Sequence, residues 1–227
     1  MLENYVKKIL GSKVYDLAVE SPLSPAPLLS RRLGLQVSLK REDMQSVYSF
    51  KLRGAYNKMA QLSEEQKSTG VITASAGNHA QGVAISAQKL GIRATIVMGL
   101  NTPSIKVNAV RDRGAKVVLH GDNYNEAALH AKNLCESEDL IYIPPYDDVD
   151  VIAGQGTSGM EIVNQHSQPL DASFIPVGGG GLVAGVASYV RSLHPGTKDI
   201  GVAGEGYNCL GAARNAGARV RGHLENA

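Results

Sequence analysis

Several residue types are scarce in this sequence, and each scarcity excludes a class of protein. The chain has no tryptophan, two phenylalanines and two cysteines among its 227 residues. Two cysteines, Cys135 and Cys209, are too few for the disulfide framework that stabilises small secreted domains. We therefore expect a protein of the reducing cytoplasm.

Charge excess and long apolar runs are absent as well. The net charge is +2 and there is no basic run, so the sequence lacks the electrostatic footprint of a nucleic-acid-binding protein. No apolar stretch is long enough to cross a bilayer. Residues 1–5 lack the basic and apolar segments of a signal peptide. We expect binding neither to nucleic acid nor to a membrane.

Glycine, in contrast, is abundant. The chain has 25 glycines, and 43% of its residues are hydrophobic, which is ordinary for a soluble globular protein. Many glycines suit tight turns between strands and helices. The composition therefore favours an α/β protein, and the length fits one large or two small domains.

Short apolar runs alternate with helical patterns in the middle of the chain. The runs lie at 71–74, 94–98, 116–119 and 140–143, and each has the length of a strand. Strands that alternate with helices form a parallel sheet covered on both faces. We therefore predict a small open-sheet domain at residues 63–147.

The flanking segments predict a second α/β domain, built from residues 1–62 and 148–227. Its expected strands lie at 36–40, 172–177 and 199–203. Its expected helices lie at 2–10, 28–33, 154–166, 182–193 and 208–216, and one more begins directly at Lys51. The helix at 182–193 is apolar on most sides and should be buried.

Capping signals predict several helix ends. Ser63 with Gln66 forms a capping box that opens a helix. Gly91 fits the position just past the end of the next helix. Asn78, with Gln81 three residues later, fits the N-cap of that same helix.

Three stretches carry chemistry that fits one site, and the first is Ser49-Phe50-Lys51-Leu52-Arg53-Gly54. Most lysines are solvated surface groups. Lys51, however, stands between an aromatic residue and a helix start. Desolvation beside Phe50 would lower its pKa, and a partly neutral amine can form a Schiff base.

The second stretch is the glycine run Gly178–Gly181, between a predicted strand and a predicted helix. It could be a flexible turn, or a loop that lets the helix pack closely. Its flanks favour an anion site, because glycines let backbone N–H groups converge at a helix N-terminus. A dinucleotide site is an alternative, since Gly179-x-Gly181-x-x-Ala184 fits that fingerprint and Glu205 could bind the ribose. That alternative leaves Lys51 and Asn78 unexplained.

The third stretch, Ser75-Ala76-Gly77-Asn78-His79, lies at the entrance of a predicted helix. A helix N-terminus exposes N–H donors that suit a substrate carboxylate. The remaining histidines show no metal-ligand spacing, so we predict no metal site. They lie at positions 120, 130, 166, 194 and 223.

The lysine, the polar loop and the glycine run, in this order, resemble the fold-type II pyridoxal-phosphate (PLP) enzymes, and most closely the biosynthetic threonine dehydratases. The resemblance runs from about Val14 to about Ile200. It implies that Lys51 holds PLP as an internal aldimine and that Phe50 packs against the pyridine ring. It also implies a cofactor site and a substrate site. The cofactor site would add Asn78, at the 3′ oxygen, and Gly178, Gly179, Gly180, Gly181 and Leu182, and the substrate site would consist of Ser75, Asn78 and His79.

The resemblance implies a reaction as well. It is the conversion of L-threonine to 2-oxobutanoate and ammonia, the first step of isoleucine biosynthesis, with L-serine as a second substrate. Lys51, once released by the substrate, would remove the α-proton. Related serine racemases carry a second serine at the position of Ala76, where it acts as the opposite base. Alanine cannot move a proton, which favours elimination over racemisation.

The family pattern also differs from this sequence in two places. A family strand ends in Val-Glu, and in some members that glutamate ligates a cation, whereas this chain reads Val202-Ala203-Gly204 before Glu205. The family's large domain continues past the position of Ala227, with a group that contacts the pyridine nitrogen.

The fold we expect is therefore a small parallel-sheet domain inserted in an incomplete large α/β domain, with PLP in the cleft between them. An incomplete large domain would expose a sheet edge and apolar surface. A homo-oligomer or a missing C-terminal segment would complete it. The alternative function is a weakly active or inactive PLP-binding or subunit-interaction protein.

Overall fold

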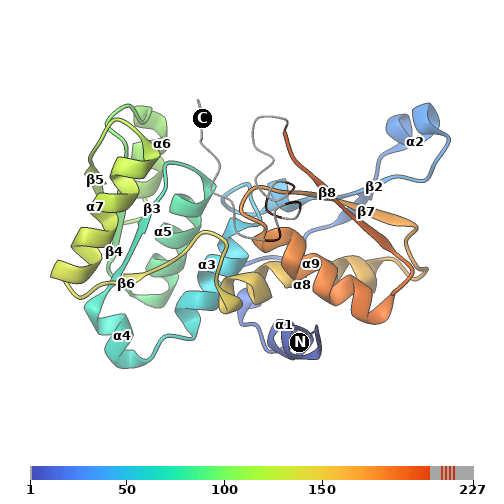
Figure 1. Cartoon of the computed structure of the whole chain (residues 1–227), viewed down its shortest axis with the longest axis horizontal. Coiled ribbons are helices and arrows are strands. Elements are labelled where there is room, and N and C mark those ends of the chain that lie inside the picture. The colour runs from blue at the N-terminus through green and yellow to red at the C-terminus, as the bar shows by residue number, and fades with distance from the viewer. Residues whose placement is uncertain (1, 205–210, 212, 214, 216, 218–227) are drawn as a thin grey trace.

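The computed structural model describes residues 2–204 and residues 211, 213, 215 and 217 (Figure 1). The described helices are α1 (Leu2–Leu10), η1 (Val14–Asp16), α2 (Pro27–Leu33), η2 (Glu42–Met44), α3 (Lys51–Ala60), α4 (Glu64–Thr69), α5 (Asn78–Leu90), α6 (Ser104–Arg111), α7 (Tyr124–Ser137), α8 (Val149–Gln165) and α9 (Gly181–Leu193). The described strands are β1 (Leu23–Pro25), β2 (Ser38–Lys40), β3 (Val71–Ala74), β4 (Ala94–Met98), β5 (Lys116–Leu119), β6 (Ile141–Tyr142), β7 (Ala172–Pro176) and β8 (Lys198–Val202). None of these helices has the length and apolar character needed to cross a membrane.

A four-stranded parallel sheet has the order β5-β4-β3-β6. Its register places Thr73 beside Ile96 and Ile96 beside Val117. The strands predicted at 71–74, 94–98 and 116–119 are confirmed, and the fourth is limited to Ile141–Tyr142. Strands buried on both faces read as continuous apolar runs, which is why the sequence predicts them well.

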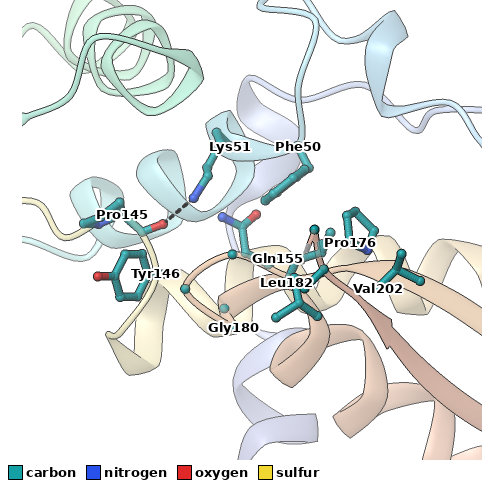
Figure 2. Close-up of a pocket in the computed structure, with 15 residues that line it drawn as sticks. Phe50, Lys51, Pro145, Tyr146, Gln155, Pro176, Gly180, Leu182 and Val202 are labelled. Carbon is teal, nitrogen blue, oxygen red and sulfur yellow. Dashed lines mark hydrogen bonds between the residues drawn. The ribbon is translucent and has the colours of Figure 1, made fainter. Parts of the chain in front are cut away.

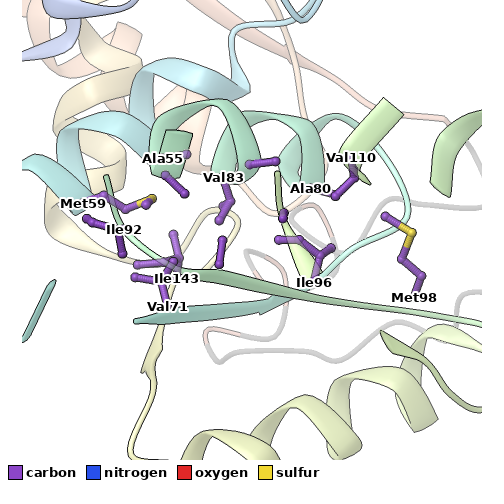
Figure 3. Packing of buried hydrophobic residues seen from close by; sticks show 14 of the residues in the cluster. Ala55, Met59, Val71, Ala80, Val83, Ile92, Ile96, Met98, Val110 and Ile143 are labelled. Carbon is purple, nitrogen blue, oxygen red and sulfur yellow. The ribbon is translucent and has the colours of Figure 1, made fainter. Parts of the chain in front are cut away.

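Helices cover both faces of this sheet (Figure 1). α5 and α6 lie on one face, where Ile96 and Met98 belong to one buried cluster with Val83 and Val110 (Figure 3). α7 lies on the other face, where Val97 is buried in a second cluster. Full burial of a side chain such as Ile96 contributes roughly 1.5–3 kcal/mol. These clusters fix the end of β3, and with it the start of the loop that leads into α5.

α3 connects this sheet to the rest of the molecule, since it packs against both α5 and α8. On one side its Ala55 and Met59 join the buried cluster of α5. On the other side the backbones of α3 and α8 touch: a Cβ on Gly154 would lie 2.7 Å from the Cα of Gly54. Only glycine permits this approach, so the helix that begins at Lys51 lies directly on α8.

β7 and β8 form a separate parallel pair, in which Phe174 lies beside Ile200. α9 packs on one face of the pair, where Ile175 is buried. On the other face Phe174 is 70% exposed and Val202 is 50% exposed. The expected exposed apolar surface is therefore present in the described part of the chain.

Two predicted helix ends are confirmed. Three other predictions are wrong: the start of α8, the N-cap of α5 and the burial of α9. The capping box of Ser63 and Gln66 is present, and Gly91 ends α5 with a left-handed φ of 67°. α8 begins at Val149 rather than at residue 154, because the carboxylate of Asp148 accepts hydrogen bonds from two backbone N–H groups of its first turn. The N-cap of α5 is Gly77, and Asn78 is already helical.

The third wrong prediction concerns the burial of α9. The helix is buried along one stripe rather than on most sides, and Leu193 is exposed at its end. The predictions made for Glu205, Cys209 and His223 concern residues outside the described part of the chain. Of the helix predicted at 208–216, the structure describes residues 211, 213 and 215, which are helical.

Candidate functional site

A cavity of about 510 Å³ lies where α3, the segment before α8 and the loop between β7 and α9 meet (Figure 2). It brings together the lysine and the glycine run that the sequence singled out. Its lining residues are Phe50, Lys51, Pro145, Tyr146, Gln155, Pro176, Val177, Gly178, Gly179, Gly180, Gly181, Leu182, Val202, Ala203 and Gly204.

Lys51 is the first residue of α3, and its amine faces this cavity. Its Nζ donates a hydrogen bond to the backbone carbonyl of Pro145, 2.7 Å away (Figure 2). The same nitrogen lies 5.5 Å from the centre of the Phe50 ring. Burial lowers the pKa of Lys51 to about 8. Roughly a tenth of the amine is therefore neutral at pH 7, far more than for a solvated lysine.

The glycine run forms the opposite wall of the cavity. Gly180 has a φ of 87° and is the N-cap of α9, so the turn into the helix uses a conformation that other residues rarely adopt. No side chain caps this N-terminus. A Cβ on Gly179 would collide with the ring of Tyr146. The loop therefore offers backbone N–H groups and the positive end of a helix dipole to an anion.

The Ser75–His79 loop lies close by but does not line this cavity. Ser75 Oγ accepts a hydrogen bond from the backbone N–H of Gly77, and Asn78 is exposed. His79 is buried, with Nε2 3.0 Å from the carbonyl oxygen of Ile143. Burial, and to a smaller degree the charge of Lys51, lowers the pKa of His79 to about 4, so its ring is neutral at pH 7.

A buried charge network is centred on Arg53, which lies in the first turn of α3, two residues after Lys51. Arg53 is fully buried and donates two hydrogen bonds to Glu42, at 2.8 Å each, and two to Glu161 of α8, at 2.5 and 3.0 Å. Burial alone would raise the pKa of Glu161, but Arg53, with help from Lys40 and Tyr15, holds it below its usual value. The network anchors the first turns of α3 and thereby orients Lys51.

Pro145, Tyr146 and Gln155 also line the cavity, although none of them was predicted as a site residue from the sequence. A backbone carbonyl such as that of Pro145 carries no side-chain signal. Gln155 has a weak signal, because it is a long polar residue between two glycines and follows the apolar run 151–153. In the described part of the chain no group of three or more histidines, cysteines or carboxylates could hold a metal ion.

Comparisons with known proteins give a consistent result. The family model described as "Pyridoxal-phosphate dependent enzyme" matches residues 14–226. The biosynthetic, chloroplastic threonine dehydratase of Arabidopsis thaliana is 56% identical over 216 residues, which are 95% of this chain and 36% of that protein.

Two solved structures are similar over nearly the whole chain. The processed form of threonine deaminase isoform 2 from Solanum lycopersicum has a TM-score of 0.94 and 54% identity, covering 97% of this chain and 64% of that one. Maize serine racemase has a TM-score of 0.91 and 28% identity, covering 98% of this chain and 67% of that one. The chain thus spans little more than a third of the length of the Arabidopsis relative.

Proposed function

Because the chain belongs to the family of pyridoxal-phosphate dependent enzymes, we propose that the cavity between α3 and the glycine loop binds PLP. The observation that carries this proposal is that Lys51 and Gly178–Gly181 line the same cavity. A primary amine with a lowered pKa can form a bond to the cofactor's aldehyde carbon, and the glycine loop suits its phosphate. A dinucleotide site would leave the amine without a role.

The proposed reaction is the conversion of L-threonine, and of L-serine, to a keto acid and ammonia. Bound PLP would supply an electron-withdrawing ring that stabilises negative charge on the substrate α-carbon. The amine of Lys51, once the substrate has released it, would take the α-proton, and the carbonyl of Pro145 holds that amine in position. The β-hydroxyl leaves as water, and water is taken up again when ammonia is released, so no oxidant is needed.

The substrate side of the site is proposed to be Ser75, Asn78 and His79. His79 is close enough to Lys51 for the charge of one to affect the pKa of the other. Its neutral ring, fixed on the carbonyl of Ile143, orients the start of α5. The N-terminal N–H groups of α5 suit the carboxylate of an amino acid. Asn78 would contact both substrate and cofactor.

We also propose the two-domain division, with residues 63–147 as the small domain and 1–62 with 148–227 as the large one. PLP would then lie between them. The exposed face of Phe174 and Val202 would be covered in a homo-oligomer or by a further segment of the large domain. A cytoplasmic location stays a prediction.

The test is to purify the chain, add PLP and then add L-threonine. A visible absorption band after PLP, followed by release of 2-oxobutanoate, is the expected result. Borohydride reduction and peptide mapping should place the pyridoxyl group on Lys51. Attachment at another lysine would contradict the assignment.

A second candidate function is a non-catalytic PLP-binding or subunit-interaction protein. The observation that favours it is the exposed apolar face of β7 and β8, which a partner would bury. The same experiment separates the two functions. PLP bound at Lys51 with no keto acid formed would select the second candidate.

The similarity to a serine racemase makes racemisation an alternative reaction to consider. Ala76 opposes it, since a methyl group cannot carry a proton to the second face of the substrate. We expect L-serine to give no D-serine, as measured by chiral chromatography. D-serine produced by the unmodified chain would contradict the one-base reaction.

A further inference from the structure

Gln155 on α8 has a side-chain amide for which the described residues offer no hydrogen-bond partner. The residue is 1% exposed, and both its Oε1 and its Nε2 are unpaired. It also lines the cavity that contains Lys51 and the glycine loop. Figure 2 shows its amide pointing from α8 toward the side of the cavity where Lys51 and Phe50 lie.

An unpaired amide at this depth requires an explanation. Buried polar groups are nearly always paired, because an unpaired one keeps its full desolvation penalty. Thr73, Ser158 and His194 carry the other unpaired buried side-chain atoms of the described chain. None of these three residues lines the cavity. Among these four residues, Gln155 is therefore the one whose missing hydrogen-bond partner can be supplied by a molecule bound in the cavity.

The packing around the amide holds it in place. A Cβ on Gly54 would lie 2.5 Å from Gln155 Nε2, so glycine at position 54 leaves the space that the amide occupies. α8 itself is closely packed on two sides, because Gly154 touches Gly54 on α3 and Gly156 touches the backbone of Gly185 on α9. The amide is thus fixed at the cavity wall by glycine contacts on two sides.

We propose that Gln155 binds the cofactor, with its amide nitrogen donating a hydrogen bond to an oxygen of PLP. This inference rests on the proposed function. PLP carries such acceptors on its phosphate and on its ring. An amide can pair with either without adding charge to a cavity that already contains Lys51.

The test compares the wild-type chain with Gln155→Met, which keeps the length of the side chain and removes its polar atoms. PLP affinity is measured by absorbance titration, and stability by urea unfolding of the chain without PLP. We expect the Kd for PLP to rise about tenfold or more. The unfolding midpoint should stay the same or rise, because the variant no longer buries an unpaired amide.

Ser158→Ala is the matched control, since Ser158 lies one turn further along α8 with a buried, unpaired hydroxyl. It should leave the Kd for PLP unchanged. Gln155→Glu is a second variant of the same length that lacks the donor, and it should also weaken PLP binding. Titration with pyridoxal, which has no phosphate, identifies the acceptor: a loss that persists assigns the ring oxygen, and a loss that disappears assigns the phosphate.

Two results would overturn this inference without contradicting the proposed function. One is equal PLP affinity of the wild-type and Gln155→Met chains. The other is a clear loss of stability in Gln155→Met, which would give the amide a structural role. A wild-type chain that binds no PLP at all would overturn both this inference and the proposed function.

Discussion

Arg53 on α3 donates two hydrogen bonds to Glu161 on α8, at a place that solvent does not reach. A second carboxylate, that of Glu42, completes the coordination of the guanidinium group. The pKa of Arg53 is raised, because these two carboxylates outweigh the opposing effect of burial. The helix that begins with Lys51 is therefore held by a fully charged residue two positions further on.

Glu161→Ala should lower the free energy of unfolding by about 3–5 kcal/mol, because it leaves the charge of Arg53 buried and only partly compensated. Urea unfolding measures this loss. Asp43→Ala is the control, since Asp43 pairs with Arg41 on the surface and such pairs contribute about 0–1 kcal/mol. Equal losses in the two variants would show that the buried network does not anchor α3.

The rate of covalent PLP attachment to Lys51 should rise with pH and level off above about pH 8. The neutral amine is the reactive form, and burial lowers the pKa of Lys51 to about 8. The measurement is the rate of attachment, trapped with borohydride at a series of pH values. Lys51→Ala is the control for attachment elsewhere. A midpoint near the 10.5 of an ordinary lysine would contradict the burial of this amine.

His79 should make the protein less stable in mild acid. The pKa of His79 is about 4 in the folded chain against 6.5 when unfolded, so the unfolded state binds the extra proton between these values. The contribution of the buried, neutral His79 ring to the free energy of unfolding is complete above pH 6.5 and is lost as the pH falls toward 4. The loss is on the order of 3 kcal/mol.

Urea unfolding of the wild-type and His79→Gln chains at several pH values checks this prediction. The variant should lose most of the pH dependence in that window. Glu161 does not interfere there, since its lowered pKa means that its own contribution is lost at more acidic pH. Identical pH profiles for the two chains would assign the effect to other groups.

Gly178→Asp should weaken PLP binding about tenfold or more relative to Gly178→Asn. A Cβ at position 178 meets no atom within 4 Å, so both side chains fit and the two variants differ mainly in charge. The carboxylate repels the phosphate at short range. Absorbance titration gives the two Kd values, and urea unfolding should give similar stabilities. Equal Kd values would remove the glycine loop from the phosphate site.

Much of the fold could be predicted because the central strands are buried on both faces. Ile72 and Ile96 each lie in a short apolar run that has the length of a strand and alternates with helical patterns. The resemblance to PLP-dependent enzymes and the α/β class are confirmed by the family match and by the similar structures. The start of α8 was predicted at Gly154, whereas Gly154 and Gly156 lie inside the helix and serve close helix contacts.

The site residues that could be predicted are those whose residue type itself indicates a chemical role. Lys51 and the glycine run do line one cavity. The hydrogen bond of Lys51 to Pro145 was not predictable, because every residue has a carbonyl and only the fold selects one. Asn78 was wrongly expected as an N-cap, since Ser75 and Gly77 form the hydrogen-bonded turn before α5. The individual roles of Ser75, Asn78 and His79 stay predictions.

The contact between Gly54 and Gly154 limits how this chain can evolve. Most close contacts tolerate a larger residue on one side if the other side becomes smaller. Here both partners are already the smallest residue, so no second change at the contact can restore the fit. A lineage that replaces either glycine must separate α3 from α8, and that moves Lys51 away from the glycine loop. Suppressor mutations for such a change should therefore be found outside this pair.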